Sequence, residues 1–101
     1  RSFCSEDGVV ARLGGEEFAI VLVNKSPNEV NSIFESLREA VNSTHFEYKN
    51  DRISITISIG ISYTSDCFEI DFSTYLSVAD QALYEAKSSG RNRTCWQPGI
   101  L

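Results

Sequence analysis

The sequence has no methionine and only one histidine, and its three cysteines form no CxxC pair. An odd number of cysteines (Cys4, Cys67 and Cys95) without that spacing argues against a metal knuckle or a closed disulfide framework and predicts a reducing compartment. No apolar run approaches the roughly 20 residues of a membrane helix, and no signal peptide is recognisable. We therefore expect a cytoplasmic domain, with any membrane anchor of the full-length protein outside this sequence.

Basic residues are also scarce: Lys and Arg number 9 against 14 acidic residues, which gives a net charge of −5. Broad electrostatic binding to nucleic acid or anionic lipid is therefore not expected. An anionic ligand would need a local basic cluster, a metal ion, or both. The 101 residues are 42% hydrophobic, enough for one small domain with a core. The opening on Arg1 without a Met suggests a fragment.

Two short runs rich in Val, Ile and Leu, residues 9–13 and 18–23, flank a pair of glycines. Gly14 and Gly15 suit the positive φ angles of a tight turn, so the sequence predicts a β-hairpin here. Glu16 and Glu17 follow, and successive strand side chains face opposite ways. One carboxylate could hold a hard cation such as Mg²⁺ while the other serves a different task. On spacing alone, an ordinary hairpin with two solvated glutamates is favoured.

A helix is predicted to begin at Ser26, where Pro27 suits the first turn and Glu29 completes a capping box. It should reach about Asn42. Its apolar face consists of residues at helical spacing: Val30, Ile33, Phe34, Leu37 and Val41. The charges on its other face are interpreted as solvated: Glu35, Arg38 and Glu39.

Residues 46–48 predict a short strand that turns at Asn50-Asp51. A strict alternation of Ile or Tyr with small residues then runs from Ile53 to Tyr63 and predicts one long strand. Its apolar face must lie on a core, and its small, hydroxylated face allows a second packed layer. Gly60 within it indicates a bulge or a close backbone approach.

The last predicted helix runs from about Ser73 to Ser89, with Leu76, Ala79, Leu83 and Ala86 as its apolar stripe, and stops at Gly90. An edge strand follows within residues 91–96, and residues 97–101 are expected to form a loose tail. The order of elements indicates an α+β domain, a mainly antiparallel sheet with helices packed on it. Two helices cannot easily cover so apolar a sheet, which suggests that part of the domain is missing.

Lys87 and Arg91 straddle the end of this helix. The helix dipole is a sufficient reason for a cation at Lys87, and alone that interpretation is favoured. The alternative is a basic clamp for phosphates, in which Arg91 contacts two oxygens at once and Arg93 lies nearby. Asp80 could orient a neighbouring group or be solvated, and Tyr84 is interpreted as a packing residue. The lone His45 lacks a partner at metal-ligand spacing.

Taken together, two segments resemble the GGDEF family of diguanylate cyclases. Residues 10–20, VARLGGEEFAI, are similar to its signature hairpin, with Glu as an accepted variant at the third position. Residues 79–93, ADQALYEAKSSGRNR, are similar to its closing helix and the basic loop after it. Both motifs stand in the family's order, and the resemblance spans nearly the whole chain. It implies a nucleotide-cyclase, palm-like fold.

The resemblance implies condensation of two GTP molecules into cyclic diguanylate with release of pyrophosphate. Each domain would hold one GTP, and two domains would meet as a homodimer. Gly14 and Gly15 would admit the nucleotide. Glu16 would bind Mg²⁺ (or Mn²⁺) and help to deprotonate the attacking 3′-hydroxyl, and Glu17 would support the metal. The residues implied to hold the β- and γ-phosphates are Lys87 and Arg91.

Two departures from the family pattern matter. The family's first strand, with a metal-binding Asp, and its base-contacting helices do not precede Arg1, so residues 1–101 are predicted to be a partial domain that is inactive alone. The family's RxxD motif is replaced by residues 5–8, SEDG, so a product-inhibition site built on it is not expected. An alternative function is a non-catalytic GGDEF module that binds GTP and regulates a linked domain. A linked sensor domain is expected in either case.

Overall fold

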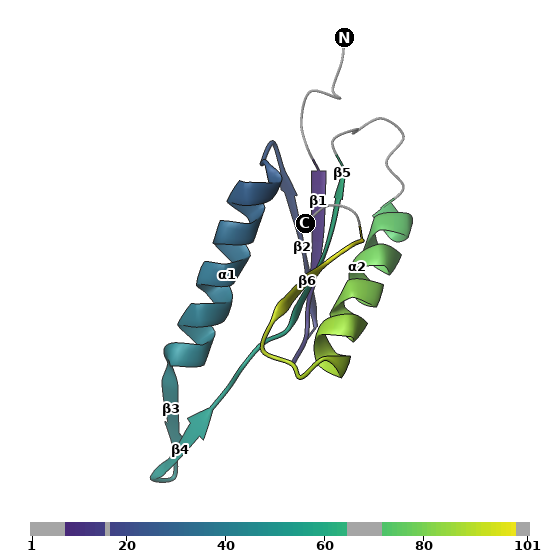
Figure 1. The fold of residues 1–101 in the computed structure, drawn as a ribbon. Helices are drawn as coiled ribbons and strands as arrows, with labels where there is room; N and C mark the ends of the chain where they lie inside the picture. The colour runs from purple at the N-terminus through teal and green to yellow at the C-terminus, as the bar shows by residue number, and fades with distance from the viewer. Residues whose placement is uncertain (1–7, 16, 65–71, 99–101) are drawn as a thin grey trace.

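The computed structural model describes residues 8–15, 17–64 and 72–98, and these form three layers (Figure 1). A four-stranded sheet lies in the middle, with helix α1 on one face and helix α2 on the other. The elements in chain order are β1 (Gly8–Leu13), β2 (Phe18–Val23), α1 (Pro27–Ser43), β3 (His45–Tyr48), β4 (Asp51–Ser54), β5 (Ile59–Thr64), α2 (Phe72–Ser88) and β6 (Thr94–Trp96).

The sheet has the order β2-β1-β5-β6. Strand β1 pairs antiparallel with β2 and with β5, whereas β5 and β6 are parallel. Leu13 at the end of β1 thus has Phe18 on one side and Ile59 on the other. The predicted α+β class, with a mainly antiparallel sheet, is confirmed. The predicted edge strand is also present, although it is shorter than residues 91–96.

Alternation along the strands explains why each face of the sheet carries a helix. The sheet side chains that face α1 are apolar, and they form the main core with Val30 and Phe34 of that helix: Val9, Ala11, Leu13, Ile59, Ile61 and Tyr63. On the opposite face lie Gly60 and Ser62 of β5, with Ser58 just before the strand. A Cβ atom on Gly60 would lie 2.1 Å from the backbone N of Leu83 and 2.3 Å from the carbonyl O of Ala79. The predicted second layer and close backbone approach at Gly60 are therefore confirmed.

Helix α1 begins with the predicted capping box. The Ser26 amide donates to Glu29 Oε1 at 3.0 Å, and the Glu29 amide donates to Ser26 Oγ at 3.3 Å. Val30 and Phe34 are buried as expected. Ile33 was assigned to the same apolar face, but it is 41% exposed, so that assignment is wrong.

The capping box makes the stability of α1 depend on pH. The hydrogen bond from the Ser26 backbone amide lowers the pKa of Glu29 from its ordinary value of 4.5. A lowered pKa means that the contribution is present above pH 4.5 and is lost as the pH falls through the folded-state value. We expect Glu29→Gln to lower the melting temperature at pH 7. The difference from wild type should shrink below pH 4.5, as measured by thermal unfolding across pH. A difference that grows in acid would contradict this assignment.

The long predicted strand is divided in two. Strand β4 ends at Ser54, and β5 begins at Ile59. Strand β4 pairs with β3 in a separate two-stranded hairpin that projects from the body (Figure 1). The alternation predicted that all the isoleucines of this segment share one face packed on the core. Ile53 and Ile55 are instead 41% and 43% exposed, because residues 53–55 lie outside the four-stranded sheet. The hairpin turn lies at Lys49-Asn50, where φ is 53° and 71°, one residue before the predicted position.

Helix α2 carries the predicted buried stripe of small and apolar residues on the face that meets β5, with Ala79, Leu83 and Ala86 buried. It ends before Gly90, whose φ of 124° fits the predicted stop. Beyond β6, the Gln97 amide donates to Ile61 O at 2.8 Å, so Gln97 is tied to the sheet. Residues 99–101 of the expected tail lie outside the described part. Neither α1 nor α2 is long and apolar enough to cross a membrane, and no other described segment is such a helix.

Candidate functional site

The signature turn and the end of α2 meet at one end of the sheet (Figure 1). Gly14 follows β1, and its amide donates to Ser58 O, just before β5, at 2.8 Å. Lys87 lies in the last turn of α2 on the face toward this turn. The two motifs that are far apart in the sequence are therefore neighbours. Glu16 lies outside the described residues.

The two glycines of the turn have different reasons to be glycine. A Cβ atom on Gly14 would lie 2.6 Å from Cε of Lys87, so Gly14 makes room for the lysine side chain. Gly15 has a φ of 105°, which disfavours any other residue, and nothing lies within 4 Å of where its Cβ would be. The turn thus has one side against Lys87 and an open side that a ligand could approach.

Four charged side chains form an ionic cluster, defined here as Arg12, Glu17, Asp80 and Lys87. The Arg12 guanidinium contacts Glu17 Oε1 at 3.2 Å and Asp80 Oδ1 at 3.1 Å. Lys87 Nζ lies 3.5 Å from Glu17 Oε2. Both oxygens of Glu17 therefore face cations. Because Glu17 is 44% exposed, such a pair is worth about 0–1 kcal/mol and exchanges readily for a more strongly charged partner.

The ionic cluster lines a small cavity of about 260 Å³, together with Leu83 and Tyr84. That volume is below the roughly 300–1,000 Å³ typical of small-molecule pockets, so it can take only part of a nucleotide. Its two cations suit the phosphate end. The base and ribose would need contacts beyond the described residues.

A larger hollow of about 890 Å³ lies along α2 and is bordered by β6. Its described lining combines small, apolar and uncharged polar residues with the carboxylates of Asp80 and Glu85, and holds no lysine or arginine. An anionic phosphate placed there would have no cation to neutralise it. The smaller cavity at the ionic cluster is therefore the better candidate for an anionic ligand.

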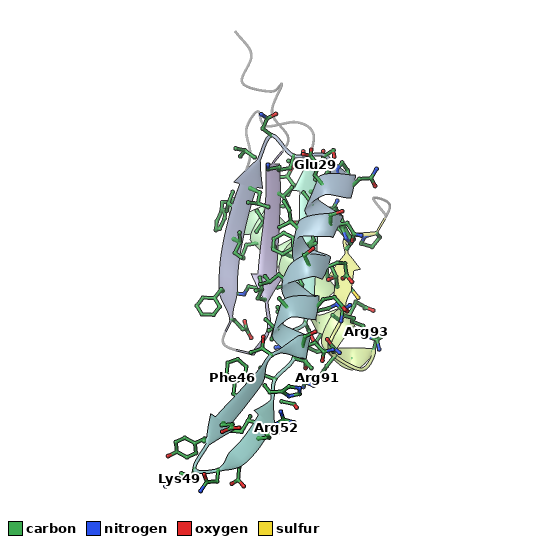
Figure 2. All side chains as sticks on the ribbon, turned by 90° about the vertical axis from the view of Figure 1, so that its left-hand side faces the viewer. Glu29, Phe46, Lys49, Arg52, Arg91 and Arg93 are labelled. Carbon is green, nitrogen blue, oxygen red and sulfur yellow. The ribbon has the colours of Figure 1, made fainter. Side chains whose placement is uncertain are left out.

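The basic loop after α2 has an unusual backbone. Gly90, Arg91 and Asn92 all have positive φ angles, of 124°, 64° and 49°. The Arg91 amide donates to Ala86 O at 2.9 Å, and the Asn92 amide donates to Ser58 Oγ at 3.1 Å. Figure 2 shows Arg91 and Arg93 beside the lower end of α1, near the base of the β3–β4 hairpin. Arg91 is exposed, and its guanidinium forms no ion pair with any described side chain.

Several interpretations from the sequence change here. Asp80 is paired with Arg12, so it orients a neighbour rather than standing alone in solvent. Tyr84, expected to pack, is 70% exposed and borders the cavity. Sequence reasoning did not single out Arg12, although a charge within the apolar β1 segment was a usable signal. Arg38 was interpreted as a solvated surface charge, but its side chain is only 15% exposed and contacts Asn92. That interpretation is wrong.

The donor set for a divalent cation is incomplete among the described residues, which contain no group of three or more His, Cys, Asp or Glu side chains suited to a metal. Mg²⁺ nevertheless needs only one or two carboxylates when phosphates supply further oxygens. Glu17 at the open turn offers such a carboxylate, and the sequence places Glu16 next to it. The chemistry of these donors fits a metal held jointly with a phosphate ligand.

Comparisons with known proteins agree with this arrangement of motifs. The family model described as "Diguanylate cyclase, GGDEF domain" matches residues 1–93. The chain is 40% identical over 86 residues to diguanylate cyclase A of Treponema denticola, which covers 82% of the chain and 22% of the relative. It is 39% identical over 93 residues to diguanylate cyclase DosC of Escherichia coli, covering 90% and 20%. The chain therefore spans only about a fifth of these relatives.

Solved structures show the same fold. The GGDEF domain of DgcB from Caulobacter crescentus, in complex with c-di-GMP, superposes with a TM-score of 0.81 at 20% identity, covering 91% of this chain and 78% of that one. The active GGEEF domain of a Vibrio cholerae diguanylate cyclase gives 0.71 at 22% identity, covering 91% and 82%. Both signature segments are in place, and the family model matches residues 1–93 of the 101. This chain therefore belongs to the GGDEF family of diguanylate cyclases.

Proposed function

We propose that the full-length protein condenses two GTP molecules into cyclic diguanylate and releases two pyrophosphates. The observation that carries the proposal is that Lys87 lies against the glycine turn and lines one small cavity together with the signature carboxylate Glu17. A site that joins carboxylates to a basic clamp suits phosphoryl transfer, because catalysis there is mostly positioning and charge stabilisation. The alternative is a module that binds GTP without turnover.

Each residue has a proposed part in the reaction. The open side of Gly15 lets the nucleotide approach the turn backbone. Lys87 exchanges its weak pair with Glu17 for the β- and γ-phosphates, and Arg91 joins it with a bidentate contact. Arg12 keeps hold of Glu17 when Lys87 leaves. Glu17, freed on one oxygen, then supports the metal and substrate geometry.

Glu16 is proposed to accept the proton of the attacking 3′-hydroxyl. The 3′-oxygen then forms a bond to the α-phosphorus of the second GTP, and the bond to the β-phosphate oxygen breaks as pyrophosphate leaves. A bound Mg²⁺ (or Mn²⁺) would supply charge neutralisation at the phosphates and orientation for in-line attack. Because one cavity takes only one set of phosphates, two such domains must meet to bring two GTP molecules together. A homodimer in the cytoplasm, controlled by a linked sensor domain, is the proposed arrangement.

The direct test is incubation of the full-length protein with GTP and Mg²⁺, with products separated by chromatography. We expect cyclic diguanylate and pyrophosphate, and an initial rate per protein that rises with protein concentration because two domains must meet. GTP binding without any product, under all activating conditions tried, would favour the non-catalytic module. Absence of both binding and product would reject a nucleotide function altogether.

A further inference from the structure

The basic loop that carries Arg91 is held from the far side of the sheet. Arg38 lies on α1, opposite the face that α2 covers, and its guanidinium reaches the loop across the end of the sheet. Its Nη1 atom donates to Asn92 Oδ1 at 2.9 Å and to Asn92 O at 3.3 Å. These residues are far apart in sequence, and the side chain of Arg38 is only 15% exposed. The contact therefore differs from an ordinary solvated surface charge.

Arg38 is itself aimed by its neighbours on α1. Its Nη2 atom donates to Glu35 Oε1 and to Glu39 Oε1, each at 2.9 Å. The bond to Arg38 lowers the pKa of Glu35, and the same pair raises the pKa of Arg38. Both partners are thus charged at neutral pH. Two carboxylates hold one edge of the guanidinium, and the other edge is left to face Asn92.

The loop needs such support because its conformation is unfavourable. Arg91 and Asn92 both have left-handed φ angles; this conformation is costly for Arg91, whereas an asparagine tolerates it better. Residues in such conformations persist only where their surroundings over-determine them. Arg38 supplies two of the bonds to Asn92, and Ser58 supplies a third. The backbone of Arg91 lies between these bonds and the last turn of α2.

We propose that Arg38 is a positioning residue for the phosphate clamp: through Asn92 it fixes the conformation of the left-handed loop that carries Arg91. Arg38 does not touch the ligand in this proposal. It acts by keeping the loop in one conformation before the nucleotide arrives, so that binding does not have to order the loop and the affinity is not reduced by that entropic cost. The expected effect of Arg38 on KM for GTP rests on the proposed function. The expected effect of Arg38 on the conformation of the loop does not.

The kinetic test is a double-mutant cycle in the full-length protein, with KM and kcat for GTP measured in Mg²⁺. We expect Arg38→Gln to raise KM about ten-fold with kcat nearly unchanged, because it weakens binding of the phosphates. In an Arg91→Ala background, the same change should alter KM by less than about two-fold, since Arg38 acts through Arg91. An equal effect in both backgrounds, or a loss of kcat alone, would overturn the proposal. The matched control is Glu47→Gln, the same kind of loss of one charge on the projecting β3–β4 hairpin, which leaves the contacts of Arg38 in place and should leave KM nearly unchanged.

The structural test is amide hydrogen exchange in the same full-length proteins without nucleotide. Exchange at Arg91 and Asn92 should rise about ten-fold or more in Arg38→Gln, because both amides are hydrogen-bonded only while the loop is held. If Arg38→Gln does not fold, Asn92→Gly serves instead, since glycine accepts the left-handed φ and removes only the Oδ1 acceptor. Unchanged exchange in the folded variant would overturn the proposal. A wild type that neither binds nor turns over GTP would reject the proposed function, and the exchange result would still decide whether Arg38 positions the loop.

Discussion

Replacement of Glu16 by Gln in the full-length protein is expected to reduce synthesis of cyclic diguanylate by about 10³-fold or more. Gln keeps the size of the side chain but can neither accept a proton nor offer a carboxylate to a metal. General-base catalysis alone is worth about 10²–10⁴-fold, and loss of metal binding adds to it. The measurement is the initial rate of product formation from GTP in Mg²⁺ for wild type and variant.

The control for this prediction is Glu47→Gln, the same chemical change at an exposed position of β3 in the projecting hairpin. It should retain nearly full activity. Thermal unfolding of Glu16→Gln should match wild type, which separates a chemical loss from a folding defect. If Glu16→Gln keeps more than about a tenth of wild-type activity, Glu16 is not the general base.

Substitution of Gly60 by Ala is expected to be the most damaging single-methyl change for stability. The new Cβ would lie within 2.3 Å of two backbone atoms of α2, from Leu83 and Ala79, and backbone cannot rotate away as a side chain can. Helix α2 would have to move away from β5, and the close packing of its buried alanines against that strand would be lost. We expect the free energy of unfolding to fall by about 3 kcal/mol or more. Chemical denaturation of the full-length protein, followed by a signal from this domain, measures it.

Gly15→Ala provides the matched comparison for this effect. It adds the same methyl group where nothing lies within 4 Å, so its only cost is the φ of 105°. That backbone cost is about 1–2 kcal/mol. Equal losses at the two positions would mean that α2 moves away from β5 without resistance, contrary to the packing described above.

Local signals in the sequence predicted much of the fold. Gly14-Gly15 between two apolar runs specified the β1–β2 hairpin, and Ser26 with Glu29 specified the start of α1, because both depend on neighbouring residues only. Gly60 between hydroxylated residues indicated the second layer. The location of Lys87 beside the turn came from the family resemblance, and the lack of room for a Cβ atom on Gly14 next to Lys87 now gives it a physical reason.

The failures concern partners that are distant in sequence. The alternation from Ile53 to Tyr63 does not reveal that β4 pairs with β3 while β5 pairs with β1. The residues around Arg38 in the sequence give no indication that it contacts Asn92. Because Arg38 lies on the polar side of its helix, it was interpreted as solvated. Charge pairing of this kind depends on how elements meet, and the meeting of α1 with the loop after α2 is a property of the whole fold.

The central position of β1 also has a consequence for the order of folding. Its pairing with β2 closes only a short turn, whereas its pairing with β5 brings Leu13 to Ile59 across nearly half of the chain. Short loops close in nanoseconds to microseconds, and distant pairings set the overall rate. The signature turn can therefore form early as a local hairpin. We expect the cavity around it to be completed later, when β5 pairs with β1 and α2 brings Lys87 against Gly14.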